Sequence, residues 1–161
     1  MKPIYQKLII LFLLLQGSLL AHCQVPCGIY NDAARIVQIQ EDFSTIQKAM
    51  NKIKELSEQQ DATSMNQMTR WILTKEEHAS KIQKVVSDYF LTQRIKAKTE
   101  GSEFDTYVKQ TTTLHQILVS AMKCKQTVDS KNVAYGLDLI ETFIDLYFDA
   151  HGKDHIKQLN E

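Results

Sequence analysis

The sequence predicts an all-α protein, an antiparallel four-helix bundle, and two patterns carry this prediction. After Pro26 the chain contains no proline, and its remaining glycines stand only at positions 28, 101, 136 and 152. Such sparseness favours long helices separated by short loops. Apolar residues also recur at steps of three and four, as amphipathic helices require. Four such helices joined by short loops pack as a bundle.

The first predicted helix begins at Asn31 or Asp32, either of which can cap its amino end, and it ends at the polar run 58–61. Its apolar stripe comprises Ile36, Ile39, Phe43, Ile46, Met50, Ile53 and Leu56. The second helix spans about 63–93, and its stripe comprises Met68, Ile72, Ala79, Ile82, Val86 and Tyr89. Lys75 interrupts this second stripe, and we interpret it as part of a solvated face.

The third predicted helix follows a loop over residues 98–101. Ser102 opens it, and Asp105 is spaced to complete a capping box. Its inward stripe comprises Phe104, Val108, Thr111, Leu114 or His115, Leu118 and Met122. We expect this stripe to pack against the other helices of the bundle.

The fourth predicted helix extends over about 130–150. Its inward stripe comprises Val133, Leu137, Ile140, Ile144 and Tyr147. Gly136 lowers the helix propensity and therefore indicates close packing at that position. Gly152 is placed to act as the C-cap of this helix. The predicted bundle thus covers residues 31–150.

An apolar leader precedes the helices. Lys2 and Lys7 give it a basic start, and residues 8–15 are apolar without interruption. Ala21 is a small residue at which an export signal can be cut. The run is shorter than the ~20 apolar residues of a membrane-spanning helix, so we expect no stable membrane anchor. We predict cleavage of residues 1–21 and a periplasmic or secreted product, or a cytoplasmic one if the leader is only a pro-segment.

Composition limits the partners and the role of the cysteines. The chain has 19 basic and 19 acidic side chains, and this balance gives no reason to expect nucleic acid or an anionic membrane as partner. Its three cysteines, Cys23, Cys27 and Cys124, are an odd number, which argues against a fold built on disulfides. We interpret Cys124 as a partly buried helical thiol.

Residues 22–30, with the sequence HCQVPCGIY, lie between the leader and the first helix and are here called the hook. Cleavage of the leader would give His22 a free amine beside its imidazole. Cys23 adds an amide nitrogen and a thiol, and Cys27 adds a second thiol. Thiolates combined with amine and amide nitrogens suit Ni(II) or Cu(II) better than magnesium, calcium or manganese, and zinc needs no deprotonated amide. These anionic donors also favour a trivalent metal, which brings a Ni(III)/Ni(II) couple within reach of mild oxidants.

The pattern HCxxPCGxY at residues 22–30 resembles the nickel hook of the nickel-containing superoxide dismutases. The resemblance implies one nickel ion per chain, held by the amine and imidazole of His22, the amide nitrogen and thiolate of Cys23, and the thiolate of Cys27. It also implies a cis bond before Pro26, which would turn the hook back on itself. The helical remainder is similar to the four-helix bundle of that family.

The same resemblance implies an activity and an assembly. Two superoxide ions would become dioxygen and hydrogen peroxide while nickel alternates between Ni(II) and Ni(III). The segment 87–90, with the sequence SDYF, is similar to a family segment whose tyrosine lies near the metal. Tyr30 and Tyr89 would therefore be catalytic residues over the open face of the metal, limiting access and ordering water or anions. The family forms homohexamers, and a maturation protease must remove the leader.

The chain departs from the family at three positions. Gln24 stands where the family often has an acidic residue. By spacing, the glutamate and the arginine that support the axial histidine in the family fall on Val37 and His78. His78 could orient or buffer the imidazole, and Arg70 or Glu77 could act in its place.

Other interpretations of these residues stay open at this point. Cys23 follows an apolar run, as in a lipoprotein signal, although His22 is larger than the small residue that precedes such a cysteine. Cys23 and Cys27 could form a short disulfide in an exported helical protein that binds a partner. A third interpretation is a copper or nickel carrier without turnover, which would bind metal but consume no superoxide.

Overall fold

The computed structural model describes residues 30–161, so the predicted leader and residues 22–29 of the hook lie outside the described part. The described residues form helices and no strand: α2 (Asp32–Ser57), α3 (Ala62–Lys84), η1 (Val85–Arg94), α4 (Phe104–Gln126), α5 (Lys131–Tyr147) and α6 (Ala150–Leu159). The predicted all-α class is therefore confirmed. None of the described helices is both long and apolar enough to cross a membrane.

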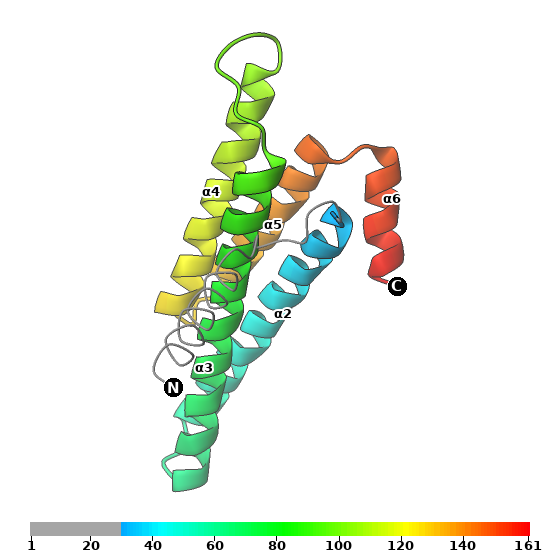
Figure 1. The fold of residues 1–161 in the computed structure, drawn as a ribbon. Coiled ribbons are helices and arrows are strands. Elements are labelled where there is room, and N and C mark those ends of the chain that lie inside the picture. Colours follow the sequence, from blue (N-terminus) through cyan, green and yellow to red (C-terminus); the bar gives the residue numbers. More distant parts are fainter. Residues whose placement is uncertain (1–29) are drawn as a thin grey trace, which may run out of the picture. The chain divides into compact units, whose positions relative to one another are not determined.

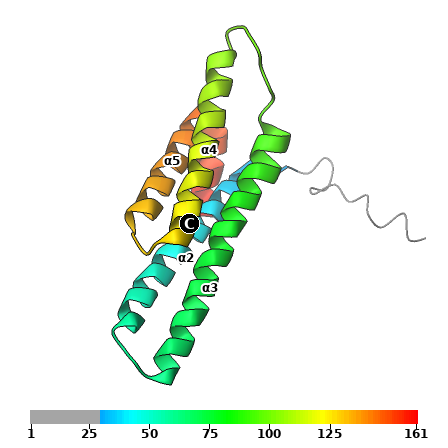
Figure 2. The ribbon, with the colours of Figure 1, turned by 90° about the vertical axis from the view of Figure 1, so that its left-hand side faces the viewer.

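Four of these helices form the bundle. Contacts join α2 to α3, α3 to α4, α4 to α5, and α5 back to α2, so the four helices close a ring around one core. Figure 1 and Figure 2 show that each helix runs antiparallel to the next along the chain. The short helix α6 packs on the outer side of α2.

The first helix agrees closely with the prediction. Six of the seven predicted stripe residues of α2 are buried: Ile36, Ile39, Phe43, Ile46, Met50 and Ile53. Asn31 is the N-cap, and its side-chain oxygen accepts the backbone N–H of Ala34 at 3.0 Å. Because Asn31 caps the helix, the Asp32 carboxylate is available for other partners.

The predicted inward face of the third helix is wrong in part, because only Leu114 of its predicted stripe is fully buried. The buried residues of α4 are Thr113, Leu114, Ile117, Ser120, Ala121 and Cys124. Phe104, Val108 and Met122 are instead exposed, by 37, 42 and 40%. At about 100° per residue, the buried face is turned by roughly 130° from the predicted one. The predicted capping box is also wrong, because α4 begins after Glu103 without a side-chain cap.

Small residues explain this rotation of α4. A Cβ atom added to Gly136 of α5 would lie 2.3 Å from Cζ of Phe43 and 2.9 Å from Oγ of Ser120. The close packing predicted at Gly136 is therefore confirmed, and it joins α2, α4 and α5. The Ser120 hydroxyl also donates to the backbone oxygen of Asn132 at 2.7 Å. Close approach and this hydrogen bond turn Ser120 inward beside Leu114 and Ile117, which are also buried, and leave Phe104, Val108 and Met122 outward.

The fourth helix is shorter than predicted, and a fifth α-helix follows it. α5 ends at Tyr147. The Asp149 side chain accepts the backbone N–H of Gly152 at 2.8 Å and so caps α6. Gly152 therefore lies in the first turn of a new helix and is not a C-cap. Ile156 of α6 is buried, which holds this helix to the body.

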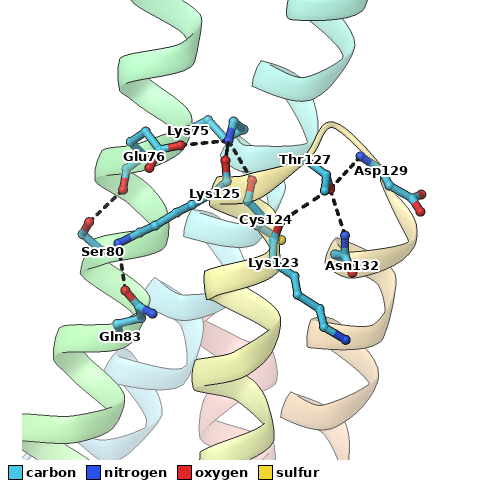
Figure 3. Close-up of polar contacts among 10 residues, drawn as sticks. All are labelled: Lys75, Glu76, Ser80, Gln83, Lys123, Cys124, Lys125, Thr127, Asp129 and Asn132. Carbon is cyan, nitrogen blue, oxygen red and sulfur yellow. Dashed lines mark hydrogen bonds and ion pairs between the residues drawn. The ribbon is translucent and has the colours of Figure 1, made fainter.

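Lys75 is buried, so its interpretation as a solvated residue is wrong. Its side chain is only 4% exposed, and its ammonium group lies 3.0 Å from Glu76. Figure 3 shows the ammonium group between Glu76 and the last turn of α4, where it donates to the backbone oxygens of Cys124, at 2.8 Å, and Lys125. The last carbonyl groups of a helix lack partners within the helix, and a cation satisfies them and complements the helix dipole. Cys124 itself is fully buried.

Replacing Lys75 by methionine should destabilise the protein. The variant keeps the apolar stem but leaves the carbonyl groups of Cys124 and Lys125 without their donor, so we expect a loss of about 1–3 kcal/mol in the free energy of unfolding. Denaturant unfolding followed by circular dichroism measures it. Lys81→Met is the matched control, because Lys81 pairs with Glu77 on the exposed face of the same helix and should change stability by less than about 0.5 kcal/mol. Equal losses in the two variants would contradict this account.

Candidate metal centre

The predicted metal ligands His22, Cys23 and Cys27 lie outside the described residues, as does Pro26. The described part begins with Tyr30, the last hook residue, which is 45% exposed. Among residues 30–161, no three His, Cys, Asp or Glu side chains gather in a way that could hold a metal ion. The donor chemistry of the hook fits nickel, since amine, amide and thiolate donors suit a square-planar ion.

A carboxylate stands where the hook joins the helical body. Asp32 is the first residue of α2, and its Oδ1 accepts the Tyr89 hydroxyl at 2.5 Å. Its Oδ2 accepts the Tyr147 hydroxyl at 2.7 Å and two N–H groups of Arg94, at 3.0 and 2.7 Å. We call these four residues the Asp32 cluster. It connects α2, η1 and α5 at one end of the bundle.

The winding of η1 allows Tyr89 and Arg94 to reach the same carboxylate. This segment is a π-helix, and the backbone N–H of Ile95 donates to the carbonyl of Phe90 at 2.9 Å, five residues back. In an α-helix, residues five apart point about 140° away from each other. In a π-helix the hydrogen bond itself joins residues i and i+5, so the two side chains lie on nearly the same side.

Aromatic rings surround the cluster. The Phe90 ring packs edge-on against Tyr89, Phe143 and Tyr147, with centroid distances of 5.1, 5.2 and 5.9 Å. The Arg35 guanidinium lies over the Tyr89 ring, 5.5 Å from its centroid. Such surroundings limit the access of water, since the Asp32 side chain is 14% exposed, and they strengthen the hydrogen bonds to the carboxylate.

These contacts shift the pKa values of the cluster. Burial alone raises the pKa of Asp32, but hydrogen bonds from Arg94, Tyr89 and Tyr147 outweigh it and hold the pKa below its ordinary value. Burial and the hydrogen bond to Asp32 raise the pKa of Tyr147 to about 12, and they raise the pKa of Tyr89 further. At neutral pH the carboxylate is therefore ionised and both tyrosines are neutral phenols.

Tyr89, one of the two predicted catalytic residues, is buried and only 4% exposed. Its hydroxyl donates to Asp32 within the helical body. Sequence analysis named Asp32 only as a possible cap and missed its role in this cluster. A signal was present, because Asp32 stands four residues before Ile36, at the end of the apolar stripe of α2.

The residues considered in place of the family's supporting glutamate and arginine differ in their burial and in their contacts. Val37 is a buried apolar residue of α2. His78 contacts Asp42 of α2, with 2.6 Å between Nδ1 and Oδ1. Glu77 forms an ion pair with Lys81 at 2.8 Å, and Arg70 lies on the exposed side of α3.

Asp42 is a second buried carboxylate that sequence analysis missed. It is 4% exposed, and its Oδ2 has no hydrogen-bond partner among the described residues. Burial raises the pKa of Asp42, and the hydrogen bond with His78 opposes that increase. Asp42 follows Ile39 by three residues, so an acidic residue on the apolar stripe was the available signal.

A helical bundle preceded by an imidazole and two thiols within six residues is typical of a metalloprotein that binds its metal before the first helix. The family model of nickel-containing superoxide dismutases matches residues 18–151, and the chain belongs to that family. It is a nickel-dependent oxidoreductase that acts on superoxide. The resemblance noted in the sequence is thereby confirmed. No curated protein and no solved structure matches the chain.

Replacing Asp32 by asparagine should lower the free energy of unfolding most above about pH 4. A carboxylate whose pKa is lowered by folding stabilises the folded state above its unfolded pKa of about 3.9. That stabilisation is lost as the pH falls through the lower pKa of the folded state. We expect Asp32→Asn to lose about 1–3 kcal/mol near pH 7, with a smaller difference near pH 3. Urea unfolding at both pH values measures this.

Asp105→Asn is the control for that measurement, because Asp105 lies in the first turn of α4 and is exposed. Its substitution should leave the free energy of unfolding nearly unchanged at both pH values. A loss in Asp32→Asn that is the same at pH 3 and pH 7 would contradict the role given to the ionised carboxylate.

Proposed function

We propose that this nickel-dependent enzyme builds its metal centre on a processed amino terminus that begins at His22. Cys23 and Cys27 would supply the two thiolates, and His22 the amine and the imidazole. The observation that carries this proposal is the pattern HCxxPCGxY at residues 22–30, which lies inside the region matched by the family model. Cleavage of residues 1–21 is part of the proposal, because an uncut chain has no free amine at His22.

The reaction converts two superoxide ions and two protons into dioxygen and hydrogen peroxide. Nickel, when bound, would supply the one-electron steps by alternating between Ni(II) and Ni(III). The residues of the chain have the other tasks. The hook amine and thiols must lose protons to bind the metal, and their reference pKa values of about 8 and 8.5 favour binding above neutral pH.

Tyr30 and Tyr89 are proposed to limit access to the metal. The raised pKa of Tyr89 keeps it a neutral phenol at working pH, so it adds no negative charge that would repel an anionic substrate. Tyr30 belongs to the hook itself, and its exposure of 45% leaves part of its ring accessible. Both are proposed as residues that order small molecules near the metal.

We also propose that residues 1–21 direct export and that a protease removes them. The basic start, the apolar run and the small residue at position 21 support this. If the leader is only a pro-segment, the same cut in the cytoplasm would give the same mature chain from 22 to 161. Fractionation of the cells that make the protein distinguishes the two.

Native mass spectrometry of the protein from its own source tests the metal centre. We expect a chain that begins at His22 and carries one nickel ion, and this protein should consume superoxide. Cys23→Ser and Cys27→Ser should each lose the nickel and the activity, because each removes a thiolate donor. Cys124→Ala is the matched control, since Cys124 is buried in α4 and should not affect nickel binding.

Three results would contradict this proposal. A chain cut elsewhere would remove the amine donor from the centre. A metal-free chain two protons lighter than expected would contain the Cys23–Cys27 disulfide instead. Nickel binding without superoxide consumption would indicate a carrier.

We propose that the mature protein is a homohexamer, as the resemblance implied. The outward face of α4 supports an assembly, because Phe104, Val108 and Met122 are large apolar residues that are 37–42% exposed. Their spacing matches a helix face that packs, yet the bundle of one chain does not cover them. Apolar helix faces of this kind are typical of subunit contacts.

Val108→Glu should therefore reduce the size of the assembly. A charge placed on this face would have to be buried without a partner in a subunit contact. Light scattering coupled to size-exclusion chromatography should show a hexamer for the wild type and smaller species for the variant. Lys109→Glu is the control, because Lys109 is the neighbouring exposed residue of α4. A wild-type monomer, or an unchanged mass for Val108→Glu, would contradict the proposal.

A further inference from the structure

We propose that Asp32 is a positioning residue for Tyr89. Its carboxylate accepts a hydrogen bond from the Tyr89 hydroxyl and fixes the direction of that hydroxyl, while Arg94 and Tyr147 hold the carboxylate in place. The inference rests on the proposed function, because the role of Tyr89 near the metal belongs to that proposal. It adds Asp32, Arg94 and Tyr147, none of which the hook pattern includes.

The geometry leaves Asp32 little freedom. Oδ1 is bonded to Tyr89 of η1, and Oδ2 is bonded to Arg94 of the same segment and to Tyr147 of α5. Rotation of the carboxylate would break hydrogen bonds to at least two elements at once. Arg94 forms an ion pair with the carboxylate, at 2.7 Å, and this keeps the carboxylate charged. Hydrogen bonds to charged groups are stronger than those between neutral groups. The Tyr89 hydroxyl is therefore directed at Asp32.

This direction decides what the Tyr89 hydroxyl can do. A phenol has one proton to donate and lone pairs that accept. Because its one proton is directed to Oδ1 of Asp32, the hydroxyl can take part in any further hydrogen bond only as an acceptor. It therefore suits a water molecule, which can donate, better than a superoxide anion, which only accepts. Of the two roles expected for Tyr89, ordering water or ordering anions, the structure favours the first.

The same carboxylate also lies close to the hook in sequence. Asp32 follows Tyr30 by two residues and Cys27 by five, and it occupies the first turn of α2. Its bonds to η1 and α5 fix that turn, which is the point where the hook leaves the helical body. The Asp32 carboxylate thus fixes both the direction of the Tyr89 hydroxyl and the first turn of α2, which directly follows the hook.

The π-helical winding of η1 supports this interpretation. Only with this winding do Tyr89 and Arg94, five residues apart, lie on nearly the same side. Thr92 and Gln93 stabilise the wide turn, since their side chains donate to the backbone oxygens of Ser87, at 2.7 Å, and Asp88, at 2.8 Å. A π-helix is rare and occurs frequently at functional sites.

A purely structural ion cluster is the competing interpretation, and the titration of Tyr89 separates the two. In mature, nickel-loaded protein, tyrosinate absorbance should show that Asp32→Asn brings the titration of Tyr89 down by about one pH unit or more. The double variant Asp32→Asn with Tyr89→Phe should titrate one tyrosine fewer in that range. This comparison removes the contribution of Tyr147, which also loses its bond to Asp32. Asp105→Asn should titrate like the wild type.

The pH profile of superoxide consumption gives the second readout. As the pH is raised, Asp32→Asn should lose activity at a lower pH than the wild type does. This loss should be absent from the double variant Asp32→Asn with Tyr89→Phe. A structural role alone would lower activity by the same factor at every pH. If Asp32→Asn yields little folded protein, Asp32→Ser gives the same comparison, because it also removes the carboxylate.

The outcomes distinguish this inference from the proposed function. An unchanged Tyr89 titration, or an unchanged pH profile in an active Asp32→Asn variant, would overturn the positioning role alone. Nickel-loaded wild-type protein that does not consume superoxide would overturn the proposed function, and the positioning role with it. A shifted titration together with a shifted profile supports both.

Discussion

The structure at the end of the bundle where α2 begins depends on the hydrogen bonds of the Asp32 carboxylate. They join the first turn of α2 to Tyr89 and Arg94 of η1 and to Tyr147 of α5. A carboxylate in such an apolar setting is stable only when its oxygens are paired. The pairing also connects the π-helix to α2 and α5. The Asp32 carboxylate therefore serves both the packing of these helices and the orientation of the Tyr89 hydroxyl.

Sequence reasoning succeeded where the information was local. The apolar stripe of α2 recurs at steps of three and four within one helix, and a contiguous run of residues, 22–30, carries the hook pattern. The Asp32 cluster could not be found in this way, since Tyr89, Arg94 and Tyr147 lie 57, 62 and 115 residues from Asp32. Only the fold brings them together.

The errors have a common physical origin. Hydrophobic periodicity identifies a helix but does not state which face the neighbouring helices cover, so most of the buried face of α4 was misplaced. Lys75 was misinterpreted because a charged residue was assumed to require water, and Asp42 was not considered as a buried group. Lys75 instead satisfies the carbonyl groups at the end of α4, and Asp42 pairs with His78. Polar residues on an apolar stripe indicate contacts between helices.

X-ray absorption at the nickel edge of the mature protein tests the central claim most directly. It reports the elements that surround the metal, and the account predicts sulfur donors together with nitrogen donors in the wild type. One sulfur should disappear in any Cys23→Ser or Cys27→Ser protein that retains nickel, and none should disappear in Cys124→Ala. A nickel ion surrounded only by oxygen and nitrogen, or a spectrum unaffected by the hook cysteines, would contradict a metal centre built on the hook.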